Sequence, residues 1–233
     1  MGTVWGEDTN VSREVLFMRK SIADNLRWAG SLMLCRQPWT KKDFDEGKVG
    51  KCSYCYDEVL KQSKTTRCKH CFGTGFEGGY KPAFIVRAQL QNNTGNHDVS
   101  NNAGLSEEQR STLRLACDGH IYGSGDLFAE IVEMKDNRPT KVGRVFQVSG
   151  DIARQTIQGL VSTDNPDAIM NLTDRMVAQQ ATARLLLGTD ERVLCSDEFW
   201  GVDKEDNPVK DTTVKPLDDT TYAERYHMSS WGL

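Results

Sequence analysis

The 233-residue sequence predicts an α+β fold in which a helix and a small cysteine-rich module precede a β-rich domain. Three observations predict it: apolar residues at helical spacing between 11 and 29, four cysteines grouped between 52 and 71, and strand-like segments after residue 82. We expect four parts: an N-terminal arm and helix at 1–46, an inserted cysteine module at 47–80, a β-rich core domain at 81–195 and an extended acidic tail at 196–233.

The N-terminal part is expected to hold one helix after a polar arm at residues 1–10. Apolar residues recur there at steps of three and four, which is the spacing of one helix face. Asn10 or Ser12 is suited to cap the start of the helix, and Gly30 to end it. The apolar stripe consists of Val11, Val15, Met18, Ile22, Leu26 and Ala29. The basic residues, which are expected on the solvated side, are Arg13, Arg19, Lys20 and Arg27.

Four cysteines form the most informative motif of the chain. They stand as two CxxC pairs, Cys52 with Cys55 and Cys68 with Cys71, and twelve residues separate the pairs. Each CxxC turn brings two sulfur atoms together, and two such turns supply the four thiolates of a tetrahedral structural Zn²⁺ site. The inserted module is therefore predicted to be a zinc ribbon with these four ligands. Because four thiolates leave no position for water, the expected zinc is structural and not catalytic.

Two other states of the four cysteines stay open from the residues alone, namely two disulfides or an iron–sulfur site. Disulfides are disfavoured because residues 1–10 lack the apolar segment of a secretory signal. His70 is expected to be an exposed spacer, which would replace a ligand only if one cysteine faced away. The remaining cysteines are expected to be free and buried, as in a reducing cytoplasm: Cys35, Cys117 and Cys195.

The charge of the chain argues against a protein that binds nucleic acid over its whole surface. Its formal net charge is −4 at pH 7. Residues 48–80 hold six basic and three acidic residues, and Zn²⁺ with four thiolates adds −2, so the module carries about +1. A ribbon that bound DNA through its phosphates would need more cations. No apolar run approaches membrane-spanning length, so no membrane role is expected.

The core domain is predicted mainly as strands. Strand-like composition is found at Leu32–Cys35, before the module, and at Ala83–Leu90 and Ser111–Cys117 within the core domain. Leu127–Met134 and Val142–Val148 flank a turn around Pro139 and form the clearest predicted hairpin.

Three other segments lack a clear strand pattern. Residues 91–104 are expected to form a polar loop or a flexible insertion because they contain no core-building side chains. Ile152–Val161 fits a helix or a strand. Leu172–Leu187 is expected to be a helix from its apolar spacing, although Val177–Leu186 also alternates as a strand would.

From Ser196 the composition becomes acidic and turn-rich, which predicts an extended tail that cannot bury itself alone. Its aromatic residues are expected to anchor it on its own domain or on a neighbour: Trp200, Tyr222, Tyr226 and Trp231. No catalytic motif is present, and Asp118-Gly119-His120 is better explained as a turn between strands. We therefore expect that the protein is not an enzyme.

Two resemblances rest on these residues. The run Cys68-Lys-His-Cys71-Phe-Gly73-Thr-Gly75 is similar to one CxxCxGxG unit of the DnaJ-type cysteine-rich chaperone domain. The first pair lacks the glycines and no further repeat follows, so chaperone function is not implied.

The second resemblance covers more of the chain. A helix ending in Arg27-Trp-Ala-Gly30, then Pro38-Trp39, CxxC and CxxCxGTGFxGGY before a β-rich domain resembles a group of tailed-bacteriophage virion proteins of the head–tail connector or neck. The resemblance implies a ring subunit that contacts copies of itself and the portal, other neck proteins or tail proteins. DNA would only pass through the ring, and the protein would be located in the virion after assembly in the host cytoplasm.

Two alternatives stand beside this interpretation: a zinc-ribbon nucleic-acid-binding regulator, and a tail or baseplate structural protein. The module carries more aromatic residues than so small a fold can bury, which predicts that some are exposed. Phe76 or Tyr80 is expected to anchor a contact with a neighbouring subunit. The five aromatic residues are Tyr54, Tyr56, Phe72, Phe76 and Tyr80.

Overall fold

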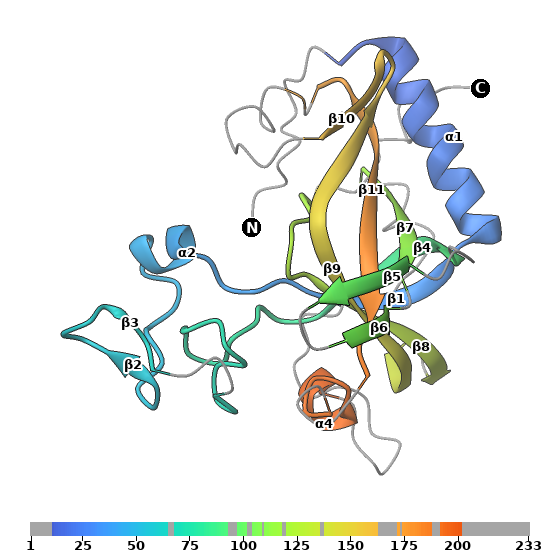
Figure 1. Cartoon of the computed structure of the whole chain (residues 1–233). Helices are drawn as coiled ribbons and strands as arrows, with labels where there is room; N and C mark the ends of the chain where they lie inside the picture. The colour runs from blue at the N-terminus through green and yellow to red at the C-terminus, as the bar shows by residue number, and fades with distance from the viewer. Residues whose placement is uncertain are drawn as a thin grey trace.

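The computed structural model describes most of the chain between residues 11 and 201 (Figure 1). The described residues are 11–64, 68–92, 97–101, 104–108, 110–117, 120–135, 138–162, 172, 174–187 and 192–201. The predicted arm at 1–10 and the tail beyond Gly201 lie outside them.

The predicted N-terminal helix is confirmed as α1, Arg13–Ala29. Ser12 is its N-cap and accepts a hydrogen bond from the backbone N–H of Val15, and Gly30 ends it. The helix packs on the ends of two strands through an apolar cluster with Ala116, Val177 and Ala178. The buried residues of α1 are Val15, Arg19, Ile22, Ala23 and Leu26.

The composition of this buried stripe differs from the prediction at several positions. Met18 and Ala29 are exposed and Val11 is only partly buried, whereas Arg19 and Ala23 are buried. The Arg19 Nε donates a hydrogen bond to the carbonyl oxygen of Met176 at 2.8 Å. Because this bond satisfies a buried donor, a basic residue that was expected on the solvated side lies inside the interface.

The body of the fold is one seven-stranded antiparallel sheet in the order β10-β9-β11-β7-β4-β1-β8. Strands β8 and β9 also pair, so six of the strands form a closed sheet and β10 extends one edge. The strands are β1 Ser31–Arg36, β4 Phe84–Asn92, β7 Arg110–Ala116, β8 Leu127–Lys135, β9 Arg138–Thr156, β10 Gly159–Ser162 and β11 Met176–Leu185.

The long strand β9 closes the sheet. Its first half pairs with β8, and its second half pairs with β11 and β10. Between Val148 and Ile152 the register with β11 shifts, and Gly150 there has a φ of +84°. Such a bulge bends a strand, which lets one chain segment pair with different partners along its length.

The inside of the closed sheet is filled by alternate side chains from its strands. Met33 and Cys35 of β1 point inward, as do Leu113 and Leu115 of β7, and Phe146 of β9. A second apolar cluster covers the other face of β1 and β8. Cys35 and Cys117 are buried as predicted, whereas Cys195 is only partly buried.

Most of the predicted strands are confirmed. The segments predicted at 32–35, 83–90 and 111–117 are β1, β4 and β7, and the predicted hairpin is β8 and β9. Ile152–Val161 resolves into the end of β9, a turn and β10.

The helix predicted at Leu172–Leu187 is wrong, because residues 176–185 form β11. This strand pairs with β7 on one side and β9 on the other, and the pairing on both sides outweighs the helical spacing of its apolar residues.

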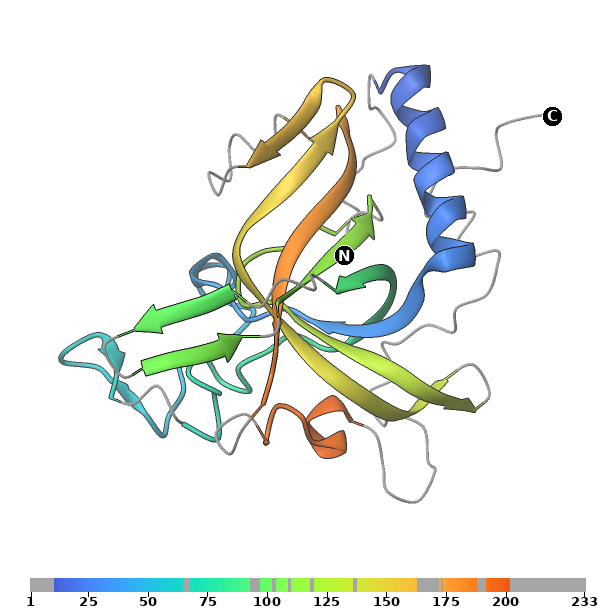
Figure 2. The same ribbon diagram turned by 45° about the vertical axis from the view of Figure 1, so that its right-hand side comes forward.

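The loop predicted at 91–104 is also wrong. β4 continues to Asn92, and β5 His97–Asn101 pairs with β6 Gly104–Glu108 as a separate two-stranded hairpin. Figure 2 shows this hairpin projecting from the closed sheet. The sequence of this ribbon lacks the alternating apolar pattern that predicts a strand.

The beginning of the predicted tail belongs to the folded body. Helix α4, Asp197–Trp200, buries Phe199 and Trp200 against the second apolar cluster. The indole Nε1 of Trp200 donates to the carbonyl oxygen of Leu194 at 2.8 Å. Trp200 thus packs on its own domain, which is one of the two positions expected for the tail aromatics. The other three tail aromatics lie outside the described residues.

The fold is therefore mixed, with one large antiparallel sheet, few helices and a separate cysteine cluster. The finer division into four parts stays a prediction.

Candidate metal centre

The cysteine module connects two neighbouring strands of the closed sheet. β1 and β4 pair antiparallel, and residues 37–83 form the excursion between them. At its base, the backbone N–H of Trp39 donates to Gly79, and that of Lys81 donates to Gln37. In the structure we use the name module for the whole excursion at 37–83. It contains a short helix, α2 Lys41–Asp45, and a small hairpin of β2 Tyr56–Asp57 and β3 Gln62–Ser63.

The structure brings the four predicted ligands together. The sulfur atoms of Cys52, Cys55, Cys68 and Cys71 lie within 4.8 Å of one another, and all four side chains are buried free thiols. The Sγ–Sγ distances are 3.9 Å for Cys52 and Cys68 and 3.3 Å for Cys55 and Cys71. A tetrahedron with Zn–S bonds of about 2.3 Å has sulfur–sulfur edges of about 3.8 Å, so the cluster fits Zn²⁺.

Backbone hydrogen bonds shape both cysteine turns in the same way. The N–H of Tyr56 donates to the carbonyl of Cys52 at 3.0 Å, and the N–H of Phe72 donates to that of Cys68 at 2.7 Å. In the second turn Phe72 adopts a φ of +50°, which lets the chain reverse immediately after Cys71. The turns are joined because the N–H of Cys52 donates to Gly75 and that of Glu77 donates to Gly50.

The thiols differ in their tendency to ionise without a metal. Burial raises the pKa of Cys55 to about 12, and hydrogen bonding with Cys71 adds to this effect. Burial also works to raise the pKa of Cys68, but backbone N–H groups of His70 and Cys71 outweigh it and lower the pKa to about 7. Four thiolates this close together need a cation to compensate their charge, which is what a divalent metal supplies.

His70 is exposed and is not part of the cluster, as predicted. Its ring stacks on that of Tyr54, with the centroids 3.6 Å apart and the planes 9° from parallel. Within the described residues, the four cysteines are the one group of His, Cys, Asp and Glu side chains placed to share a metal ion.

The prediction that Phe76 or Tyr80 is an exposed interface anchor is wrong, because both side chains are buried in their own chain. Tyr80 lies edge-on to Phe199 of α4 at 5.6 Å, and Phe72 lies edge-on to the same ring at 4.9 Å. These contacts attach the module to the body of the fold. The large exposed residues of the module are Phe44, Tyr54, Val59 and Leu60.

An ion pair also fixes the base of the module. The ammonium of Lys81 lies 2.8 Å from the Asp43 carboxylate, which caps α2 together with Thr40. Burial works to raise the pKa of Asp43, but hydrogen bonds from Lys81 and Thr40 outweigh it and lower the pKa. No sequence pattern indicated this pair, because its partners are far apart in the chain.

Sequence reasoning also missed Asp126, a buried acid near the base of the module. Its carboxylate accepts hydrogen bonds from Gln37 Nε2 and the backbone N–H of Gly123. His120, from the Asp-Gly-His run, stacks on Phe84, and its carbonyl accepts a bond from Gln179. Asp118 and Gly119 lie outside the described residues.

Comparison with models of known protein families found no match, and comparison with curated protein sequences found no relative. Among the described residues, no helix is long and apolar enough to cross a membrane.

Proposed function

We propose that this chain is a structural subunit of a tailed-bacteriophage particle, a component of the head–tail connector or neck ring, with a structural Zn²⁺ held by the four cysteines. The phage assignment is supported by the sequence resemblance around Cys68–Tyr80. The zinc assignment is supported by the buried four-sulfur cluster. When bound, the metal would join the two cysteine turns, and a closed thiolate shell supplies no catalytic position.

The observation that carries an assembly role is a pair of exposed apolar surfaces. We call the first the module tip; it consists of Val59 and Leu60, and Val59 is 89% exposed. The second, the outer face of α1, consists of Phe17 and Trp28, and Trp28 is 86% exposed. Aromatic and large apolar side chains that lie exposed are common anchors of protein–protein contacts.

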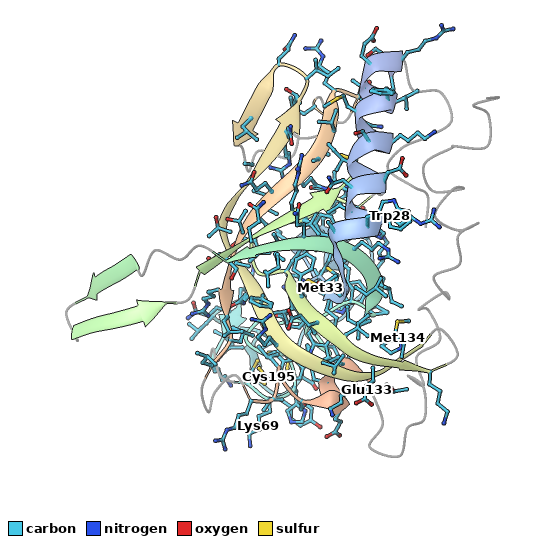
Figure 3. All side chains as sticks on the ribbon, turned by 90° about the vertical axis from the view of Figure 1, so that its right-hand side faces the viewer. Trp28, Met33, Lys69, Glu133, Met134 and Cys195 are labelled. Carbon is cyan, nitrogen blue, oxygen red and sulfur yellow. The ribbon has the colours of Figure 1, made fainter. Side chains whose placement is uncertain are left out.

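Both surfaces are held by local structure. At the module tip, the carboxylate of Asp57 accepts hydrogen bonds from the backbone N–H groups of Val59 and Leu60, which fixes the turn. On α1, Phe17 and Trp28 are three turns apart, about 16 Å along the axis, on the side opposite the buried stripe. Figure 3 shows Trp28 on the side of α1 that faces away from the sheet.

The β2–β3 hairpin, whose turn forms the module tip, and helix α1 lie on opposite sides of the molecule (Figures 1 and 2). A ring of identical subunits needs two different surfaces on each chain, one for each neighbour. In the proposed ring, the module tip of one copy contacts the outer face of α1 of the next. Neck, portal or tail proteins would contact other parts of the subunit, DNA would only pass through, and the protein would reside in the virion and not act as an enzyme.

A mass-spectrometric inventory of purified particles tests the assignment. We expect this chain in the stoichiometry of a ring, with about one zinc per chain. Recovery with isolated tails instead of heads and necks would favour the tail or baseplate alternative. Absence from particles, together with DNA binding that weakens steeply with salt, would replace the proposal by the regulator alternative.

A further inference from the structure

The ammonium of Lys51 lies over three aromatic rings. Its Nζ is 4.3 Å from the ring centroid of Phe76, 4.4 Å from that of Phe44 and 5.0 Å from that of Tyr56. An ammonium within about 6 Å of a ring face is attracted by the ring quadrupole, and the attraction grows when water is excluded. Three rings around one cation form an aromatic cage.

We propose that Phe44, Tyr56 and Phe76 form an alkylammonium-binding site that Lys51 fills from within the chain, and that the filled site is a clasp that slows loss of the metal. The clasp rests on the proposed metal centre but not on the phage assignment. Its ligand class is a primary or quaternary alkylammonium, because these cations fit an aromatic cage.

The position of the cage explains how it holds the metal centre. Lys51 directly precedes Cys52, and it forms a backbone bridge with Phe76 of the second cysteine turn. Tyr56 follows Cys55 in the first turn, so the cage spans both turns. Separation of the turns, which would release the metal, would also pull the ammonium away from its rings.

Phe44 extends the clasp to a third element. It belongs to α2, and its ring centroid lies 6.2 Å from that of Phe76. Helix α2 is in turn fastened to the base of the module by Asp43 and Lys81. The cage therefore links the metal-binding turns to the part of the module that is attached to the closed sheet.

Lys69 is the matched control. It also stands next to a cysteine ligand, but it is exposed and makes no such ring contact among the described residues. Figure 3 shows Lys69 at the outer edge of the molecule. A general effect of positive charge beside the cluster would therefore appear at both lysines, whereas the clasp depends on Lys51 alone.

The first experiment measures metal release from the full chain into an excess of chelator. We expect Lys51→Met to release zinc about five-fold faster than the wild type, because it keeps the aliphatic stem and loses the cation. Lys69→Met should release it at the wild-type rate, and Lys51→Arg should remain close to wild type because a guanidinium also stacks on rings. Equal rates for Lys51→Met and Lys69→Met would overturn the clasp.

The second experiment fills the emptied cage from solution. With Lys51→Ala, added propylammonium or tetramethylammonium chloride should slow zinc release, whereas sodium chloride at the same concentration should not. The double variant Lys51→Ala/Phe44→Leu should not respond. Absence of rescue in the single variant would overturn the alkylammonium site.

A third measurement needs no variant. We expect the rings that face the ammonium to shift the Cε protons of Lys51 upfield in the NMR spectrum of the wild type, with Lys69 as the reference and the zinc content measured on the same sample. Random-coil shifts for Lys51 would overturn the cage. A wild-type chain with shifted Lys51 protons but no bound zinc would overturn the metal centre and leave the alkylammonium site standing.

Discussion

Gly78 and Gly79 share a left-handed backbone, with φ values of +67° and +71°, but they differ in the space around them. A Cβ added at Gly78 meets nothing within 4 Å, whereas one at Gly79 would lie 2.6 Å from the carbonyl oxygen of Cys71. We expect Gly78→Ala to lower the free energy of unfolding by about 1 kcal/mol, from backbone strain alone.

Gly79→Ala should cost more than Gly78→Ala and should also speed zinc release, because the clash displaces the backbone of a ligand. Chemical denaturation of both variants, with zinc content measured in parallel, checks this. Equal losses at the two positions would show that the chain shifts at Gly79 without disturbing Cys71.

Asp126 links the stability of the protein to pH. The residue is buried, and burial raises its pKa from the ordinary value of 3.8 to about 7, although hydrogen bonds from Gln37 and Gly123 and the charges of Lys81 and His120 act in the opposite direction. Between these two pH values the folded state holds the proton more tightly than the unfolded state. The contribution of Asp126 to the free energy of unfolding is therefore largest in acid. It falls as the pH rises towards 7 and is constant above that pH.

Asp126→Asn keeps an oxygen acceptor for Gln37 and Gly123 and removes the charge. We expect the variant to gain stability relative to the wild type as pH rises from 5 to 8. Urea unfolding of both proteins at each pH measures the difference between their free energies of unfolding. The pH dependence of metal binding is common to both proteins and cancels in this difference. A difference that does not change with pH would contradict the assignment.

The four-residue helix α4 connects three parts of the fold through one side chain. Phe199 contacts the rings of Phe72 and Tyr80 from the module, and the guanidinium of Arg36 in β1 lies 4.7 Å from its centroid. Phe199 thus joins the tail, the module and the closed sheet.

Phe199→Ala is expected to lower the free energy of unfolding by about 3–5 kcal/mol, because it leaves a cavity among aromatic rings. Phe17→Ala, which removes the same side chain from the exposed side of α1, should change it by less than about 0.5 kcal/mol. Thermal or chemical denaturation compares the two. A small loss at Phe199 would mean that α4 is not part of the cooperative fold.

The metal-binding turns and the closed sheet have separate buried clusters, although Phe72 and Tyr80 of the module also pack in the cluster around α4. The buried cluster of the module consists of the four cysteines, whereas the sheet has its own apolar interior. We expect a chelator to increase amide exchange in residues 50–64 and 68–80 while β4, β7 and β11 stay protected, because metal binding supplies the folding free energy of such modules. Exchange that rises equally in both regions would show that they fold as one unit.

The proposed ring contact can be tested by mixing two variants. Val59→Asp/Leu60→Asp damages the module tip, and Trp28→Asp damages the outer face of α1, so neither variant should form rings alone. A mixture should stop at a heterodimer, because one intact tip meets one intact α1 face and no further contact follows. Light scattering of the mixture checks this. Rings formed by either variant alone would place the contact elsewhere.

The local features of the chain were determined by sequence alone. α1, the β8–β9 hairpin and the four-cysteine set each depend on residues close together in the chain, so a local pattern was enough to predict them. A CxxC turn places its two sulfur atoms whatever surrounds it, so the candidate site was predictable down to its ligands.

The remaining features of the fold depend on contacts between residues that are distant in sequence. β11 is a strand because β7 and β9 pair with it on both sides, although its apolar spacing also suits a helix. Closure of the sheet needs β1 to pair with β8 and β11 to pair with both β7 and β9, and no local pattern encodes these long-range pairings. Arg19, Phe76 and Tyr80 are buried for the same reason: burial is set by what packs against a side chain, and sequence spacing fixes only the direction in which it points.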